Sequence, residues 1–331
     1  MPIRLPRALR ASTISTLSAV VAMSLSADVL DAQRAPRIVP VTFSSGGETL
    51  VGRLLLPADA PAGTRLPGVV VTGAWMTVKE QMATTYATQL AQRGMAALVF
   101  DFRGWGESGG AVRQRENPSQ KIEDIMAAAA FLATRPEIDP ARVGGLGICA
   151  SAGYMVTAAT RSSAIRSVAL VAPWLQDGAI VEAVYGGKAG VDGLMAAGRA
   201  AETAYAASGT QTFVPAASLT DKRAIMFGVP YYTEADRGMI PAWRNEADPA
   251  FWPAWLTFDA MPAASLTKPF FMVHSDAAAI PQGAKQFYAA LAAPKSQQWL
   301  DGVSQLDFYD RPAPVTQASD AVARHFTSTL R

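Results

Sequence analysis

Two long, uninterrupted runs of apolar residues limit the folds available to this chain more than any other feature of its sequence. Leu66 to Thr72 reads LPGVVVT and ends at Gly73, and Met95 to Phe102 reads MAALVFDF and ends in a glycine-rich turn. Apolar runs of this length are typical of parallel strands that are buried on both faces. Between them, Val78 to Arg93 has a helical pattern with Gly94 directly after it, where helices commonly end. The pattern predicts a strand, a helix and a second strand of one parallel sheet.

The same alternation continues along most of the chain. The further predicted elements are a helix at 122–134, a strand at 142–147, a helix at 151–160, strands at 167–171 and 270–274, a helix at 281–291, a strand at 296–300 and a helix at 313–330. Strands that alternate with helices indicate an α/β protein with a mostly parallel, doubly wound sheet that is covered on both sides. Half of the 331 residues are hydrophobic, which is enough for one large core.

Residues 174–264 break this alternation. Prolines divide the segment into short pieces, and it is rich in aromatic residues, namely Trp174, Tyr185, Tyr231, Tyr232, Trp243, Trp252, Trp255 and Phe258. We therefore expect a core of residues 27–173 and 265–331, with 174–264 as a helical cap inserted between the sixth and seventh strands. Aromatic rings above an active site make an apolar pocket, and Trp174, Tyr185 and Tyr231 are the candidates for substrate binding. The alternative is that such rings only pack the cap against the core.

The predicted strand at 142–147 leads into a turn of small residues around Cys149, the only cysteine of the chain. A nucleophile elbow holds its reactive residue at a sharp strand-to-helix turn and needs small residues two positions before and two positions after it. Gly147 and Ser151 meet that need. Amides at the start of the following helix would lower the pKa of the thiol, so we predict that Cys149 is a nucleophile. The alternative is an inert buried side chain, the usual fate of a free cysteine.

From about Val39 onward the chain resembles the α/β-hydrolase superfamily. The motifs that carry the resemblance are TGAWMTVKEQM from Thr72, DFRGWGESGG from Asp101, GICASAGY from Gly147, HSDAAAIP from His274 and DGVSQLDFYD from Asp301. The cysteine elbow is similar to that of dienelactone hydrolases, and the long insert resembles the capped bacterial members. The resemblance implies acyl chemistry with an oxyanion hole of two backbone amides. These would be Ala150 and Ala74, or Trp75 if the loop is shifted by one residue.

The resemblance also implies a histidine in the loop after the last strand, where this chain has Gln305. Of the two histidines, His274 ends the predicted seventh strand and is the candidate base, whereas His325 lies on the closing helix. Asp276 occupies the usual position of the catalytic acid. Either Cys149 works as a preformed thiolate, stabilised by donors such as the Gln305 amide, or a shifted loop draws His274 into the site.

The expected function is hydrolysis of an ester, thioester or lactone of a small apolar acyl group. The alternatives are other carbonyl chemistry, as in a lyase, isomerase or acyl transferase, and a ligand-binding protein without catalysis. A net charge of +2 without a basic stripe argues against nucleic acid. The histidines are too few for a metal site, and phosphate-binding loop patterns are absent, so we expect no cofactor. The sequence leaves the oligomeric state open, a dimer included.

Residues 1–26 have the three parts of an export signal. Arg4, Arg7 and Arg10 precede an apolar stretch from Ile14 to Leu25, and small residues stand before Ala27. The stretch is too short for a membrane span, which needs about 20 apolar residues. We expect a signal peptide and a periplasmic or secreted protein, with a disordered cytoplasmic tail as the alternative.

Overall fold

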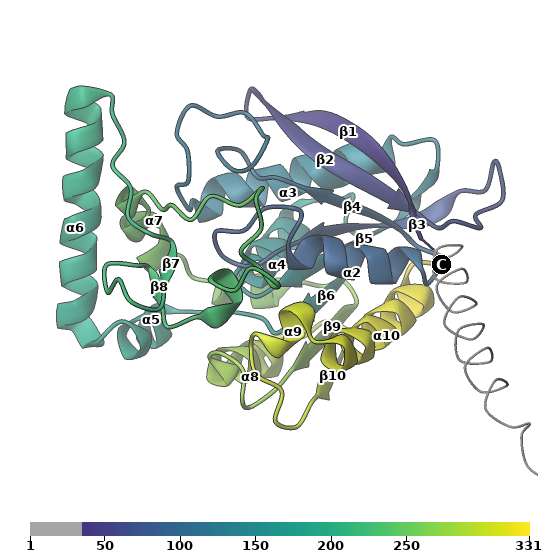
Figure 1. Ribbon diagram of the computed structural model, residues 1–331. Coiled ribbons are helices and arrows are strands. Elements are labelled where there is room, and N and C mark those ends of the chain that lie inside the picture. Colours follow the sequence, from purple (N-terminus) through teal and green to yellow (C-terminus); the bar gives the residue numbers. More distant parts are fainter. Residues whose placement is uncertain (1–34) are drawn as a thin grey trace, which may run out of the picture.

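In residues 35–331, which the computed structural model describes, eight strands form one central sheet (Figure 1). They are β1 (Arg37–Ser45), β2 (Glu48–Leu56), β3 (Leu66–Thr72), β4 (Ala96–Phe100), β5 (Ile138–Ile148), β6 (Ser167–Val171), β9 (Phe270–His274) and β10 (Lys295–Trp299). Their order is β1-β2-β4-β3-β5-β6-β9-β10. The strand β2 runs antiparallel to β1 and β4, and the other pairs are parallel. This confirms the predicted α/β fold. The predicted signal peptide lies outside the described residues and stays a prediction.

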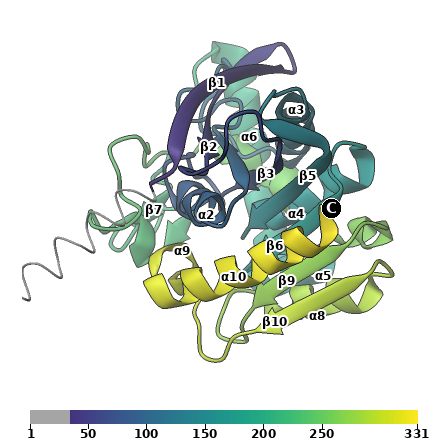
Figure 2. The same ribbon diagram turned by 90° about the vertical axis from the view of Figure 1, so that its right-hand side faces the viewer.

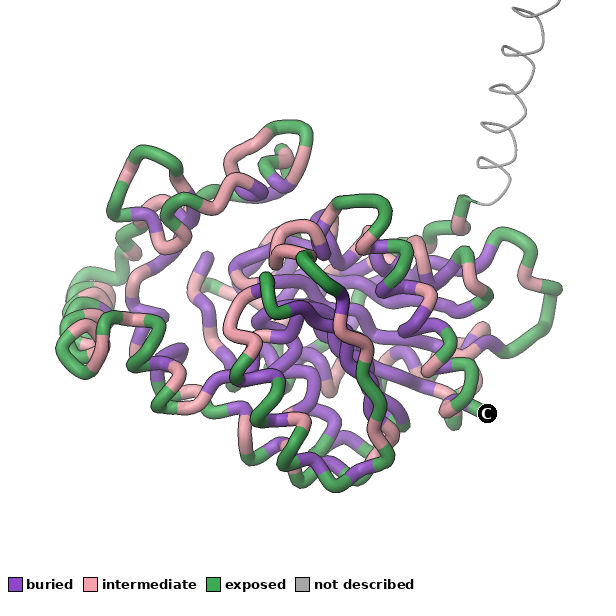
Figure 3. Tube along the Cα trace, turned by 90° about the horizontal axis from the view of Figure 1, so that it is seen from below, coloured by how far each residue is buried: buried purple, intermediate pink, exposed green. Residues whose placement is uncertain are grey.

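Helices cover both faces of the sheet (Figure 2). On one face α2 (Met82–Ala91) packs against α10 (Pro312–Thr329), and on the other α3 (Pro118–Ala133) packs against α4 (Ser151–Arg161). Two further helices are α8 (Pro281–Ala290) and α9 (Asp307–Asp310). Every residue of β4, β6 and β9 is buried, so these strands have no solvent-exposed face. Figure 3 shows the buried strands inside an exposed shell. Among the described residues, no helix has the length and hydropathy to cross a membrane.

The predicted bounds hold for β3, β6 and β9, but α2 begins at Met82 rather than at Val78. The preceding residues form a turn instead. The amide of Lys79 donates to Asp101 Oδ1 at 2.8 Å, and the amide of Val78 donates to Gln81 Oε1 at 3.0 Å. The helix therefore begins only at Met82, because Lys79 contacts the distant residue Asp101. The local sequence pattern could not indicate this contact.

The insert lies between β6 and β9, the sixth and seventh strands of the main sheet, as predicted. It contains α5 (Gly178–Val184), α6 (Gly187–Ser208), α7 (Trp252–Leu256), the two-residue strands β7 (Ala217–Ser218) and β8 (Met226–Phe227), and 3-10 turns at 230–232, 249–251 and 261–265. In Figure 1 these elements stand together at the left, with α6 outermost. The strands β3, β5 and β6 end toward this insert, so the turns that follow them can share a site with it.

Candidate active site

Cys149 stands at the turn between β5 and α4. Its φ of +56° lies in the left-handed region, which is strained for a residue with a side chain and is typical of functional turns. Its amide donates to the carbonyl of Val171 at 3.1 Å, and its carbonyl accepts from the amide of Trp174 at 2.9 Å. A Cβ atom at Gly147 would lie 2.7 Å from the Cα atom of Ala152, so this position needs glycine. The turn has the geometry of a nucleophile elbow.

Cys149 lines a cavity of about 410 Å³ between the sheet and the insert. The core side of the cavity consists of Trp75, Cys149, Ala150, Ala279, Gln305, Leu306 and Tyr309. The insert side consists of Trp174, Val184, Tyr185, Ile225, Met226, Phe227, Gly228, Val229, Tyr232 and Trp255. Of the described residues that line the cavity, none carries a charge. Such walls suit an uncharged, apolar ligand.

Aromatic rings form much of the cavity wall. Trp75 stacks on Trp255 with ring centroids 4.7 Å apart, and the indole of Trp255 donates to the Tyr185 hydroxyl at 2.7 Å. The indole of Trp174 donates to Gln176 Oε1 at 2.8 Å. These hydrogen bonds fix the rings of Trp174, Tyr185 and Trp255, whereas the indole Nε1 of Trp75 is buried without a protein partner. Trp174 and Tyr185 therefore lie where the sequence analysis expects a substrate.

Tyr231, the third candidate for substrate binding, does not line the cavity. It is buried and packs edge-on against Tyr232 and Tyr309, with ring centroids 5.0 and 5.1 Å away. Both of those tyrosines do line the cavity. Tyr231 thus supports the wall from behind, which is the packing alternative that the sequence analysis left open.

The structure decides between the two candidates for the second oxyanion donor. The amide of Ala74 donates to the Met82 sulfur at 3.4 Å and so faces the core. The amides of Trp75 and Ala150 lie close enough to the Cys149 sulfur to oppose the effect of burial on the pKa of its thiol. An oxyanion hole needs two backbone N–H groups that meet at the nucleophile, and the amides of Trp75 and Ala150 have the placement that this requires.

Gln305, which replaces the expected histidine, is held in one orientation. Its Oε1 accepts from the amide of Ala279 at 3.0 Å, and its Nε2 donates to the carbonyl of Ala172 at 2.9 Å and to the Tyr309 hydroxyl at 3.2 Å. The side chain of Gln305 also lies close enough to the Cys149 sulfur to lower the pKa of the thiol. A carboxamide in this position can orient neighbouring groups, but it cannot accept a proton at neutral pH.

Tyr309 belongs to the site, although the sequence analysis missed it. Its hydroxyl accepts from Gln305 and hydrogen-bonds to the Cys149 sulfur, to which it can donate its own proton. Tyr309 stands four positions after Gln305 in the same loop motif, and that spacing places two side chains on one face of a helical turn. The spacing was the one available signal for this residue.

Burial raises the pKa of the Cys149 thiol above its ordinary value, whereas we predicted a lowered one. The Tyr309 hydroxyl, the amides of Ala150 and Trp75 and the Gln305 side chain act in the opposite direction, but they offset only part of the cost of burying a charge. The resting form at neutral pH is therefore the thiol and not a preformed thiolate.

His274 and Asp276, the candidate base and acid, do not line the cavity. His274 is fully buried, its ring packs edge-on against Trp299 with centroids 5.2 Å apart, and burial lowers its pKa to about 4. Asp276 is exposed and pairs with Lys285 at 2.5 Å. His325 lies elsewhere, against the hydroxyl of Ser167 at 2.8 Å. The candidate base and acid therefore both lie outside the cavity that contains Cys149.

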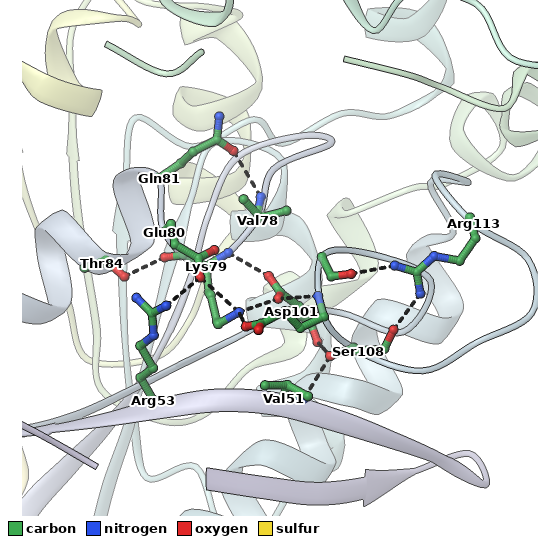
Figure 4. A network of polar contacts seen from close by, with 12 residues as sticks. Val51, Arg53, Val78, Lys79, Glu80, Gln81, Thr84, Asp101, Ser108 and Arg113 are labelled. Atoms are coloured by element: carbon green, nitrogen blue, oxygen red, sulfur yellow. Dashed lines mark hydrogen bonds and ion pairs between the residues drawn. The ribbon is translucent and has the colours of Figure 1, made fainter. Parts of the chain in front are cut away.

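A buried ion-pair network holds the chain that follows the Trp75 loop (Figure 4). The ammonium group of Lys79 lies 2.7 Å from Asp101 Oδ2, 2.5 Å from Glu107 Oε2 and 3.0 Å from Glu80 Oε1. The side chains of Lys79 and Asp101 are 1% and 0% exposed. Together they tie the start of α2 to the glycine-rich turn after β4. Both residues therefore have a structural role.

Comparison with known proteins identifies the family. The family model for X-Pro dipeptidyl-peptidases of the S15 family matches residues 46–304. The chain belongs to this family. The fold is that of solved α/β-hydrolases such as GrgF from Penicillium sp. sh18, which superposes with a TM-score of 0.73, and the protein is accordingly a hydrolase. Within residues 35–331, no three histidine, cysteine or carboxylate side chains lie close enough together to hold a metal ion.

Individual relatives agree with this assignment. The uncharacterized protein YcjY of Escherichia coli is 32% identical over 263 residues, which is 76% of this chain and 85% of YcjY. The protein PA2218 of Pseudomonas aeruginosa is 31% identical over 82% of this chain and 76% of its own, and its crystal structure superposes with a TM-score of 0.78 over 89% of this chain and 94% of that chain. The thiohydrolase aneE of Aspergillus aculeatus is 34% identical over 131 residues, 39% of each protein.

Proposed function

We propose that the protein cleaves thioesters and esters of apolar acids through Cys149. One observation carries the proposal: the sulfur of a strained elbow, the amides of Trp75 and Ala150 and an uncharged aromatic cavity meet at one place. The amides can stabilise the negative charge that develops on the carbonyl oxygen when the sulfur attacks. The cavity can hold the acyl chain in the absence of water.

The lining of the cavity supports an ester-type substrate rather than the peptide that the family description names. A dipeptidyl-peptidase must accept the free ammonium group of its peptide close to the bond that it cleaves. Burial of an ammonium group without a carboxylate costs several kcal/mol, on the order of 5. No described residue of the cavity wall supplies a carboxylate.

A thioester is the substrate that best suits a site without a histidine. The Cys149 sulfur would bond to the carbonyl carbon, and the C–S bond to the leaving thiolate would break. The leaving thiolate takes up the proton that Cys149 loses, so that acyl-Cys149 and a free thiol remain. An alkoxide leaves much less readily without a general acid than a thiolate does. The likeness to a thiohydrolase over 39% of the chain supports the same choice.

The test compares wild type with Cys149→Ala on an octanoyl thioester of N-acetylcysteamine, with free thiol and intact protein mass as readouts. We expect the mass of an octanoyl adduct in wild type, and a loss of turnover of at least about 100-fold in the variant. Met155→Leu is the control, because Met155 is buried on the same helix and does not line the cavity. Turnover by Cys149→Ala at the wild-type rate would contradict the proposal, and ligand binding without any turnover would favour the binding-protein alternative.

A further inference from the structure

The cavity lacks a group that could activate water for the second half of a hydrolysis. Its described lining residues include no histidine, carboxylate or amine. Gln305 stands at the expected position of the base and is neutral. Burial raises the pKa of Tyr232 and Tyr309 well above the ordinary value, so neither hydroxyl takes part as a base at neutral pH. General-base catalysis typically contributes about 10²–10⁴-fold to such a step.

The cavity also offers little to hold a water molecule. An ordered water in a protein interior needs about two to four polar partners. Most side chains around the sulfur are aromatic or aliphatic, and the polar atoms of Trp174, Tyr185 and Gln305 already have partners in the protein. The indole Nε1 of Trp75 has no protein partner, but this single donor falls short of the number that an ordered water needs. Two large apolar side chains of the lining, Val184 and Phe227, are 41% and 48% exposed, so the outer part of the cavity is apolar as well.

We propose that the acyl group on Cys149 passes mainly to an incoming thiol rather than to water, which makes the protein an acyl transferase between thiols. This inference rests on the proposed function, since it starts from acyl-Cys149. A thiol needs no base in the protein, because a few per cent of it is already ionised near neutral pH and thiolates are strong nucleophiles.

The transfer step balances without any further reactant. The incoming thiolate, having released its proton to solvent, forms a C–S bond with the acyl carbon. The amides of Trp75 and Ala150 stabilise the charged oxygen of the intermediate. The bond from the acyl carbon to the Cys149 sulfur then breaks, and the Cys149 thiolate takes up a proton from solvent. One thioester is replaced by another, with no net change in bond type.

The site supports the departure of Cys149 better than the arrival of water. The hydroxyl of Tyr309 and the side chain of Gln305 both line the cavity beside the sulfur, where they stabilise the thiolate as it forms. The Gln305 side chain is locked by three hydrogen bonds, to Ala279, Ala172 and Tyr309. It therefore cannot turn to bind and orient a water molecule.

The experiment measures the fate of the acyl-enzyme. The full chain is acylated with p-nitrophenyl octanoate, excess ester is removed, and the octanoyl adduct is followed by intact mass in buffer alone and with millimolar N-acetylcysteamine. We expect the thiol to speed loss of the adduct by at least about tenfold and to yield an equal amount of the octanoyl thioester. Equal rates with and without thiol, with octanoate as the product, would overturn the inference.

Substitution of Gln305 tests whether water reacts slowly with acyl-Cys149 because the site lacks a base. Gln305→His introduces a base in the loop, and we expect it to speed loss of the adduct in buffer by about tenfold or more over Gln305→Met, the control of similar length. Equal rates of the two variants in buffer would contradict the reasoning from the missing base. The two proposals fail in different ways: no adduct on wild type, with turnover intact in Cys149→Ala, would overturn the proposed function itself.

Discussion

Tyr309→Phe isolates one hydrogen bond to the sulfur. The substitution removes the hydroxyl that hydrogen-bonds to Cys149 and leaves a ring of nearly the same size in the cavity wall. Gln305 cannot move to replace the lost donor, because its hydrogen bonds to Ala279 and Ala172 remain. The expected consequence is a less stable thiolate and a higher pKa of the thiol.

The size of the effect follows from the strength of the bond. A hydrogen bond to a charged acceptor contributes about 1.5–3 kcal/mol. One pKa unit corresponds to about 1.36 kcal/mol, so the pKa of Cys149 should rise by about one to two units. Only the thiolate reacts with an alkylating agent, and at neutral pH its population should fall by about 10–100-fold. Loss of the Tyr309 hydroxyl and burial of the thiol both raise the pKa of Cys149.

The assay is the rate of alkylation of Cys149 by iodoacetamide across neutral and alkaline pH, followed by intact mass. We expect the rate profile of Tyr309→Phe to move to higher pH, with little change in the rate that both proteins approach when fully ionised. Tyr231→Phe is the matched control, because Tyr231 is a buried tyrosine that packs on Tyr309 but does not line the cavity. Profiles that coincide for wild type and Tyr309→Phe, or an equal shift in the control, would refute the reasoning.

Two further predictions concern stability. Lys79→Met leaves the carboxylate of Asp101 buried without its cation, and should lower the free energy of unfolding in urea by about 3–5 kcal/mol. A loss within the roughly 1 kcal/mol of a surface pair would contradict this. Burial holds the pKa of His274 at about 4, below the 6.5 of an exposed histidine, so between these pH values the unfolded state binds more protons than the folded state. The free energy of unfolding should therefore be highest above pH 6.5 and should fall toward pH 4, by about 3 kcal/mol at most. His274→Phe should make this decline shallower but not abolish it, because burial also lowers the pKa of His325 to about 4, and an unchanged slope would show that His274 is not the cause.

The strands were the most predictable part of the fold. The strands β3, β6 and β9 have the bounds that their apolar runs indicate, because burial on both faces of a parallel sheet requires apolar side chains at nearly every position. The start of α2 was not predictable. It depends on the contact of Lys79 with Asp101, two residues that are distant in the sequence and adjacent only in the folded chain.

The candidate site was likewise predictable only in part. The elbow at Cys149 was predictable because its small neighbours are adjacent in the sequence. It was not predictable that the amide of Trp75, rather than that of Ala74, lies beside the sulfur, since a loop shifted by one residue has the same sequence pattern. Nor was the orientation of the loop after β9, which buries His274 against Trp299 and turns Asp276 to the surface.

By itself, the sequence determined the fold class, the place of the insert and the position of Cys149 at the elbow, because these depend on the polarity and size of residues that are neighbours in the chain. Only the tertiary structure decided what surrounds the sulfur: Tyr309 and Gln305 as donors, an uncharged wall from the insert, and no histidine among the described lining residues. It also decided the direction of the thiol pKa. The physical reason is that the stability of a buried charge depends on the solvent excluded by all surrounding segments, and these segments meet only when the chain has folded.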